Sequence, residues 1–249
     1  MSGHSKWSTI KRQKGVADAQ RGQLFTKLSK EIIISAKQGG PDPNANFGLR
    51  MAVQKARENN MPADNIDRAI KRATGGGDGV EMSEIMYEGY GPAGTAVIVE
   101  VATDNRNRTV AEVRNVFARA GGSLGESGSV AWNFDSRGLI SVVSNGQDPD
   151  EVALYAIDAG AEDVQVGDDS IEVYTAPGDL EKVKKALEDH KLKVESAEAA
   201  RVPKTTVQLD EKSAIQMLRL VEKLEALDDV QRVYFNAEFS DDVLASYTS

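Results

Sequence analysis

Cysteine is absent from the 249-residue sequence, and histidine occurs only twice. The lack of cysteine excludes disulfides, cysteine-ligated zinc, iron–sulfur clusters and thiol catalysis. No apolar run approaches the roughly 18 residues that a membrane span requires. The N-terminus also lacks the apolar segment of a secretory signal. We therefore expect a cytoplasmic protein that does not enter a membrane.

Residues suited to catalysis are equally sparse. His4 lies in the N-terminal segment and His190 near an expected helix end, and no serine–histidine–aspartate set or metal-ligand cluster is visible. The glycine-rich stretch 75–79 lacks the Lys-Ser/Thr pair of a phosphate-binding P-loop, so a linker is the better interpretation. We expect no enzymatic activity, no cofactor and no metal site.

Charge is unevenly distributed along the chain. The formal net charge is −9, yet residues 1–75 hold 14 Lys and Arg against 6 Asp and Glu, a net charge of +8. The remaining residues carry a net charge of −17. A basic segment on an acidic body is typical of a polyanion-binding module. The alternative is that the basic and acidic parts contact each other within the molecule.

The first third of the chain has helical periodicity. Apolar side chains recur at four-residue spacing within residues 17–38, which predicts an amphipathic helix. Gly39-Gly40-Pro41 ends this helix. Two further helices are expected at 44–59 and from Pro62 onward, and the glycines at 75–77 close the segment.

The pattern then changes to that of strands. Residues 95–103 are rich in β-branched side chains and predict a strand. Thr109 and Glu112 have the spacing of a capping box for a helix that ends at Gly121. Residues 129–134 are interpreted as a second strand. Together these elements predict a βαβ unit.

A run of six elements follows, in the order β-α-β-β-α-β of the ferredoxin-like arrangement. Its strands are expected at 139–143, 164–166, 171–174 and 193–197, and its helices at 148–160 and 177–190. After Pro203 a strand, a long helix and a strand are expected at 205–209, 211–227 and 230–238. This last run would complete a second sheet with the earlier βαβ unit.

We therefore predict an α+β protein with an N-terminal three-helix domain and two ferredoxin-like βαββαβ-type domains, one inserted in the other. The expected domains are a basic tail with the helical domain, a discontinuous α/β middle domain and an inserted ferredoxin-like domain. Their boundaries are 1–75, then 76–135 plus 204–240, and 136–203.

The basic head is the main candidate for nucleic-acid binding. Cationic side chains there would neutralise phosphates and release counterions, so that affinity falls with salt. Trp7 could stack on an exposed base, and His4 could add a donor or a second stack. The alternative is a charged tail whose tryptophan packs on the helical domain. The cations are Lys6, Lys11, Arg12, Lys14, Arg21, Lys27 and Lys30.

A second candidate is the turn 104–109, which follows a strand and opens a helix. Backbone N–H groups at a helix start favour anions, and Arg106 and Arg108 would add bidentate donors. The alternative is a solvated turn whose arginines pair with nearby acidic residues. Tyr87 and Tyr90, in a glycine-rich stretch, could form a stacking platform or fill a domain interface.

Six stretches together resemble the YebC/PmpR family, and they span the chain in order. They are GHSKW at 3–7, RGQLFTK at 21–27, NNMP at 59–62, YEGYGP at 87–92, DNRNRTVAEVR at 104–114 and GSVAW at 128–132. The resemblance implies a helical domain followed by two α/β domains, and no enzymatic activity. It implies contact roles for Lys6, Trp7, Arg106 and Arg108 by position.

Members of this family are described mostly as DNA-binding transcriptional regulators of bacteria. A mitochondrial relative is described as a translational activator, and some bacterial members as translation factors at proline-containing stretches. The sequence thus favours a nucleic-acid-binding regulator of gene expression, with DNA or ribosomal RNA as the partner. The alternatives are a ribosome-associated translation factor and a protein-interaction scaffold. The oligomeric state is left open.

Overall fold

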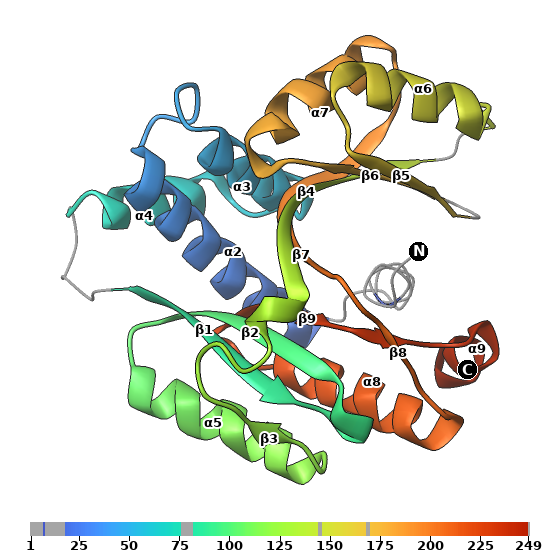
Figure 1. Cartoon of the computed structure of the whole chain (residues 1–249). Coiled ribbons are helices and arrows are strands. Elements are labelled where there is room, and N and C mark those ends of the chain that lie inside the picture. Colours follow the sequence, from blue (N-terminus) through green and yellow to red (C-terminus); the bar gives the residue numbers. More distant parts are fainter. Residues whose placement is uncertain (1–6, 8–17, 76–81, 144–145, 168–169, 249) are drawn as a thin grey trace. The chain divides into compact units, whose positions relative to one another are not determined.

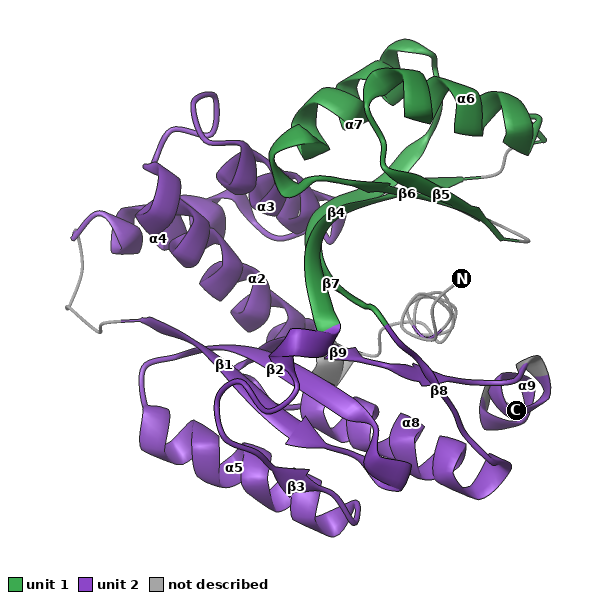
Figure 2. Cartoon of the chain, viewed as in Figure 1, with its two compact units in different colours: residues 1, 134–204 green, residues 2–133, 205–249 purple. Residues whose placement is uncertain are grey.

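The chain divides into two compact units (Figure 2). The purple unit in Figure 2 comprises Ser2–Asn133 and Thr205–Ser249 and is called the first unit, because it holds the N-terminal helices. The green unit, called the inserted unit, comprises Phe134–Lys204. The predicted helical and middle domains therefore fall in one unit, and their separation as domains stays a prediction. The computed structural model describes residues 7, 18–75, 82–143, 146–167 and 170–248 (Figure 1).

From residue 18 on, the described part of the first unit opens with the three expected helices, α2 (Asp18–Gly39), α3 (Phe47–Glu58) and α4 (Ala63–Ala73). Asn46 joins the first two, because its Oδ1 accepts from Leu49 N at 3.1 Å and caps α3. Its Nδ2 donates to the Ser35 and Gly40 carbonyls at 2.7 and 2.8 Å at the end of α2. Leu28 and Ile32 of α2 are buried against α3 and α4 in a core of their own. Within the described residues, none of the helices has the length and apolar character of a membrane span.

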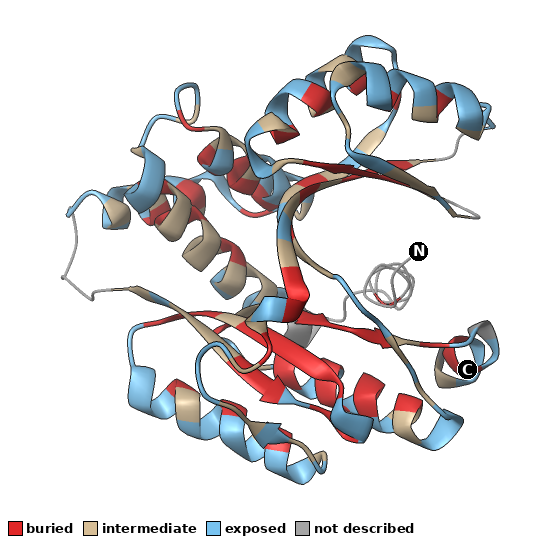
Figure 3. Cartoon of the chain, viewed as in Figure 1, coloured by how far each residue is buried: buried red, intermediate tan, exposed pale blue. Residues whose placement is uncertain are grey.

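A four-stranded antiparallel sheet follows, in the order β3-β1-β2-β9. Helices α5 and α8 cover one face, where Val99 of β2 packs with Phe117 and Leu218, all fully buried (Figure 3). Alternate residues of β2 supply this core because strand side chains alternate between faces. The strands are β1 (Ser83–Tyr90), β2 (Ala96–Thr103), β3 (Ser123–Leu124) and β9 (Val230–Phe235), and the helices are α5 (Arg106–Arg119) and α8 (Glu211–Glu225).

Several expectations for this sheet were wrong in detail. Strand β1 was not expected, since its Gly89 and the glycines after it suggested a turn. Residues 129–134 were expected as a strand, but they contain the short 3-10 helix η2 (Ala131–Asn133), and the strand after α5 is β3. The expected strand at 205–209 is β8 (Val207–Gln208), which pairs in parallel with β10 (Ala237–Glu238) outside the main sheet. Helix α9 (Asp241–Thr248) closes the chain.

The inserted unit has the predicted ferredoxin-like arrangement. Its sheet order is β5-β6-β4-β7, with every neighbouring pair antiparallel. Strands β4 and β7 are longer than expected, because their pairing continues to Phe134 and Pro203. The elements are β4 (Phe134–Val143), α6 (Pro149–Ala159), β5 (Asp163–Val166), β6 (Ser170–Thr175), α7 (Leu180–Asp189) and β7 (Val194–Pro203). These elements and the N-terminal helices confirm the predicted α+β class.

Two residues of the first unit join the chain segments that lead into and out of the insertion. Asn133 is buried, and its Oδ1 accepts from Thr205 N and Oγ1 at 3.2 and 2.7 Å. Its Nδ2 donates to the Thr205 carbonyl at 3.1 Å. The side-chain amide of Asn133 thus pairs with both the N–H and the carbonyl of Thr205, a residue that lies in no strand.

Candidate nucleic-acid interface

The basic residues nominated from the sequence fall into three groups. The first group lies outside the described residues: His4, Lys6, Lys11, Arg12 and Lys14. The second is exposed, and consists of Arg21 at the start of α2 and Arg106 at the start of α5. The third, Lys27, Lys30 and Arg108, contacts acidic or carbonyl groups of the chain itself.

Trp7 does not present its ring to solvent. It is only 3% exposed and belongs to the core formed by α8 and the sheet. Its Nε1 donates to Glu225 Oε2 at 3.1 Å, and its ring meets Tyr247 edge-on with centroids 6.1 Å apart. In this conformation the ring cannot stack on a base, because its faces are covered by the core. Burial of so large an aromatic ring is itself favourable. The partner is the sheet core rather than the helical domain named in the alternative.

A buried carboxylate, Asp229, pairs with two cations of the third group, Lys30 and Arg108. Its Oδ2 accepts from Arg108 Nη2 at 2.7 Å and from Thr109 Oγ1 at 2.6 Å. Thr103 Oγ1 donates to the same oxygen at 3.0 Å, and Lys30 forms an ion pair with Oδ1. We call these five residues the Asp229 cluster.

Charge and hydrogen bonding decide the ionisation of this cluster. Asp229 is 3% exposed, and burial alone would favour its neutral form. Hydrogen bonds from Arg108, Lys30 and Thr109 outweigh burial and hold the pKa of the carboxyl well below its ordinary value. The cluster joins α2, the end of β2 and the start of α5, so it stabilises the first unit.

The neighbouring cation Lys27 has a similar role. Its Nζ donates to the main-chain carbonyl of Glu225, the last residue of α8. A cation at a helix C-terminus interacts favourably with the helix dipole. Two of the lysines nominated on α2 therefore bind the body of the protein, as the intramolecular alternative anticipated.

At the start of α5 the two arginines have different surroundings. The N-cap is Asn105, whose Oδ1 accepts from Arg108 N at 3.1 Å, so the expected capping box at Thr109 was wrong. Arg108 also pairs with Asp104 at 3.0 Å. Both arginines are exposed, but Arg108 is held by two carboxylates, whereas Arg106 Nη2 donates to Ser83 Oγ at a long 3.3 Å. Of the two arginines, Arg106 is thus the more accessible to an anion.

The two tyrosines of β1 also differ. Tyr87 packs against the sheet core, and burial raises the pKa of its hydroxyl. Tyr90 is 40% exposed, and its hydroxyl donates to the Ser129 carbonyl at 3.1 Å. Trp132, which sequence reasoning did not nominate, is 68% exposed, the highest value among the exposed large hydrophobic side chains described. Its position in an expected strand concealed this exposure.

The loop that carries Trp132 is held by a single carboxylate. Glu88 of β1 is 2% exposed and accepts from the backbone N–H groups of Gly128, Val130 and Ala131 at 2.6, 2.8 and 2.7 Å. Burial opposes the charged form, but these three hydrogen bonds prevail and lower the pKa of Glu88.

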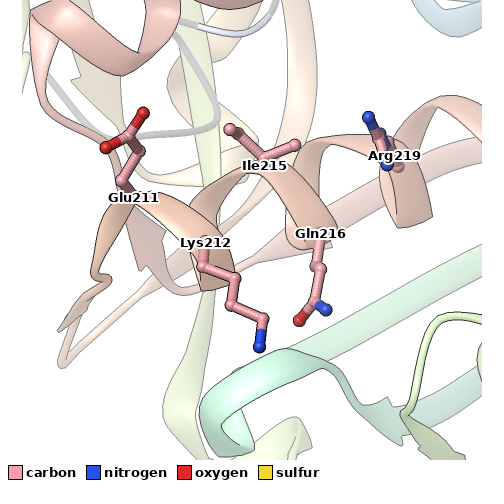
Figure 4. Close-up of a pocket in the computed structure, with 5 residues that line it drawn as sticks. All are labelled: Glu211, Lys212, Ile215, Gln216 and Arg219. Carbon is pink, nitrogen blue, oxygen red and sulfur yellow. The ribbon is translucent and has the colours of Figure 1, made fainter.

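A further surface depression lies along α8 (Figure 4). Its lining combines two cations, one carboxylate, an amide and an aliphatic side chain: Lys212, Arg219, Glu211, Gln216 and Ile215. Among the described residues, no group of three or more carboxylates or imidazoles is placed to hold a metal ion. This mixed lining carries no specific chemistry.

Known proteins resemble the chain along its whole length. The model of the TACO1/YebC N-terminal domain matches residues 5–76, and that of the TACO1/YebC second and third domain matches residues 82–237. A protein of Dehalococcoides mccartyi named "probable transcriptional regulatory protein" is 56% identical and aligns with 100% of this chain and 99% of its own. A protein of the same name from Pelotomaculum thermopropionicum is 55% identical over 97% of this chain and 100% of its own. A crystal structure of a conserved hypothetical protein from Aquifex aeolicus superposes with a TM-score of 0.84 at 46% identity, covering 90% of this chain and 93% of that one.

Proposed function

Since the chain belongs to the TACO1/YebC family, we propose that it regulates gene expression by binding nucleic acid through its basic N-terminal segment. The observation that carries this proposal is the separation of charge, +8 over residues 1–75 against −17 over the rest. Phosphates attract the first part and are repelled by the second, which directs binding to one segment. The names of the relatives, probable transcriptional regulatory proteins, agree with a role in gene expression.

The contacts within the chain narrow the set of phosphate-binding side chains. Lys30 and Arg108 bind Asp229, and Lys27 binds the Glu225 carbonyl, so a phosphate would have to displace these partners. We assign the main contacts to Lys6, Lys11, Arg12 and Lys14 of the head, because these four cations lie within nine residues of sequence, with Arg21 and Arg106 as exposed additions.

The test is the salt dependence of binding to a DNA duplex. Each phosphate contact contributes about 0.9 to the slope of log K against log salt, so replacing Lys6, Lys11, Arg12 and Lys14 by Ala should reduce the slope by about 3.6. The matched control replaces four exposed lysines of the acidic inserted unit, Lys182, Lys185, Lys191 and Lys193. This control removes the same formal charge and should leave the slope nearly unchanged. The proposal would be refuted if the slope fell equally in the two variants, or if the wild-type slope were near zero.

A further inference from the structure

We propose that Trp132 and Tyr90 form a stacking platform for an unpaired nucleobase. The inference rests on the proposed nucleic-acid binding and adds a second contact, made by residues distant in sequence from the basic head. Both rings belong to the first unit, with exposed fractions of 68% and 40%. Both donate to one acceptor, the Ser129 carbonyl: Trp132 Nε1 at 3.0 Å and Tyr90 Oη at 3.1 Å. One backbone oxygen therefore brings two aromatic side chains together at the surface.

The loop beneath the rings is fixed before any ligand arrives. Glu88 and Tyr90 lie two residues apart on β1, so they face the same side of the sheet. The Glu88 carboxylate takes up three backbone N–H groups of the segment 128–131, directly before Trp132. Ordering costs on binding fall when the binding group is already positioned.

Close packing adds to this restraint around Ser129. Its hydroxyl is buried and has no hydrogen-bond partner among the described residues. A side chain at Gly125 would place a Cβ atom 2.5 Å from that hydroxyl oxygen. The turn therefore has little room to rearrange, and the Ser129 carbonyl keeps its direction toward the two rings.

The chemistry of the rings points to bases rather than to a polar ligand. The indole N–H and the phenol O–H both donate within the protein, so the exposed ring surfaces act mainly through dispersion and stacking. Every base has a π-face, so such stacking tolerates any sequence, and it requires an unpaired base. The basic segment in the same unit would hold the phosphates of the same strand.

The aliphatic patch of the inserted unit does not have these properties. Leu154 and Ile157 of α6 are 64% and 49% exposed, and the same helix carries the exposed acidic residues Glu151 and Asp158. Aliphatic side chains offer no π-face, and the acidic surroundings repel phosphates. Leu154 is therefore a suitable control for loss of exposed apolar surface.

The experiment measures the affinity of the full-length protein for a short single-stranded oligoadenylate and for a blunt-ended, fully paired duplex. Stacking of one base is worth about 1–3 kcal/mol, so Trp132→Ala should weaken oligoadenylate binding by roughly 5- to 150-fold. Binding to the duplex should change much less, because no unpaired base is present. Trp132→Phe should recover most of the affinity, and Leu154→Ala should bind as the wild type does. The salt slope should be the same in all of these variants, since no phosphate contact is removed.

Each outcome separates the platform from the basic head. If Trp132→Ala binds oligoadenylate as tightly as Leu154→Ala does, the platform is refuted. The assignment of the head is decided separately, by the salt slope of the fourfold head variant. If Trp132→Ala loses affinity while the fourfold head variant keeps both affinity and slope, the platform is supported and the head assignment fails. If the wild type binds neither probe, both proposals fail. A thermal melt of Trp132→Ala shows that any loss of affinity is not a loss of fold.

Discussion

Arg108 donates from Nη2 to Oδ2 of Asp229 at 2.7 Å, across 121 residues of sequence. Asp229 directly precedes β9, while Arg108 lies in the first turn of α5. Lys30 of α2 reaches the other oxygen of the same carboxylate. One buried acidic residue thus connects the helical segment with the sheet and pairs with two cations that would otherwise attract phosphate.

Replacing Asp229 by Asn should destabilise the protein by about 3 kcal/mol, the cost typical of leaving buried charges without their partner. The substitution preserves volume but leaves Lys30, which is 12% exposed, without its counter-charge. The measurement is urea unfolding at neutral pH. The control is Asp228→Asn, since that neighbour is exposed and should change stability by less than about 0.5 kcal/mol.

Wild type and Asp229→Asn should differ in how their stability responds to acid. The pKa of Asp229 is lowered in the folded state, so its contribution is complete above the unfolded value of about 4 and is lost as pH falls toward the folded value. The difference in unfolding free energy between wild type and Asp229→Asn should therefore shrink below about pH 4. A difference that stays constant into that range would show that the carboxylate charge contributes little.

The two tryptophans should differ sharply in their effect on stability. Trp7→Ala should cost about 3–5 kcal/mol, because it leaves a cavity beside α8 and removes the hydrogen bond to Glu225. Trp132→Ala should cost far less, since Trp132 is 68% exposed. Thermal denaturation of both variants measures this contrast. Equal melting temperatures would contradict the burial of Trp7.

Glu88→Gln should loosen the loop that carries Trp132. A glutamine has one acceptor oxygen where the carboxylate has two, and its NH₂ group would face backbone N–H donors, so we expect a loss of about 1–3 kcal/mol. Acrylamide quenching of Trp132, measured in a Trp7→Phe background, should become more efficient. Glu126→Gln is the control, because it removes the same charge from an exposed position in the same loop. Unchanged quenching in Glu88→Gln would show that the three hydrogen bonds do not hold the loop.

Gly122→Ala should also destabilise the first unit, by about 1–3 kcal/mol. A Cβ atom at this position would lie 2.4 Å from the backbone oxygen of Tyr90, which cannot move without disturbing β1. Gly22→Ala provides a comparison of opposite sign, because nothing lies within 4 Å of its added Cβ and alanine favours the helix. Chemical denaturation should rank Gly22→Ala above wild type and Gly122→Ala below it.

Local sequence patterns determined much of the fold. The apolar spacing of α2 and the Gly-Pro stop after it predicted the first helix, and the six elements of the inserted unit appeared in their correct order. These patterns succeed because helical periodicity and strand alternation depend on neighbouring residues. Strand β1 was missed because Gly89 resembles a turn residue. Its glycine is required instead by packing, since a Cβ atom there would lie 2.7 Å from the Ser123 carbonyl.

The sequence by itself determined that cations gather in the first third of the chain and acidic residues in the rest. Only the tertiary structure decided which of these cations are engaged, because Asp229 lies 121 residues from Arg108 and 199 from Lys30. It likewise decided that Trp7 is buried and Trp132 exposed, a difference that composition and spacing do not contain. Such choices depend on which surfaces meet in the folded chain, and desolvation and ion pairing act only after those surfaces have met.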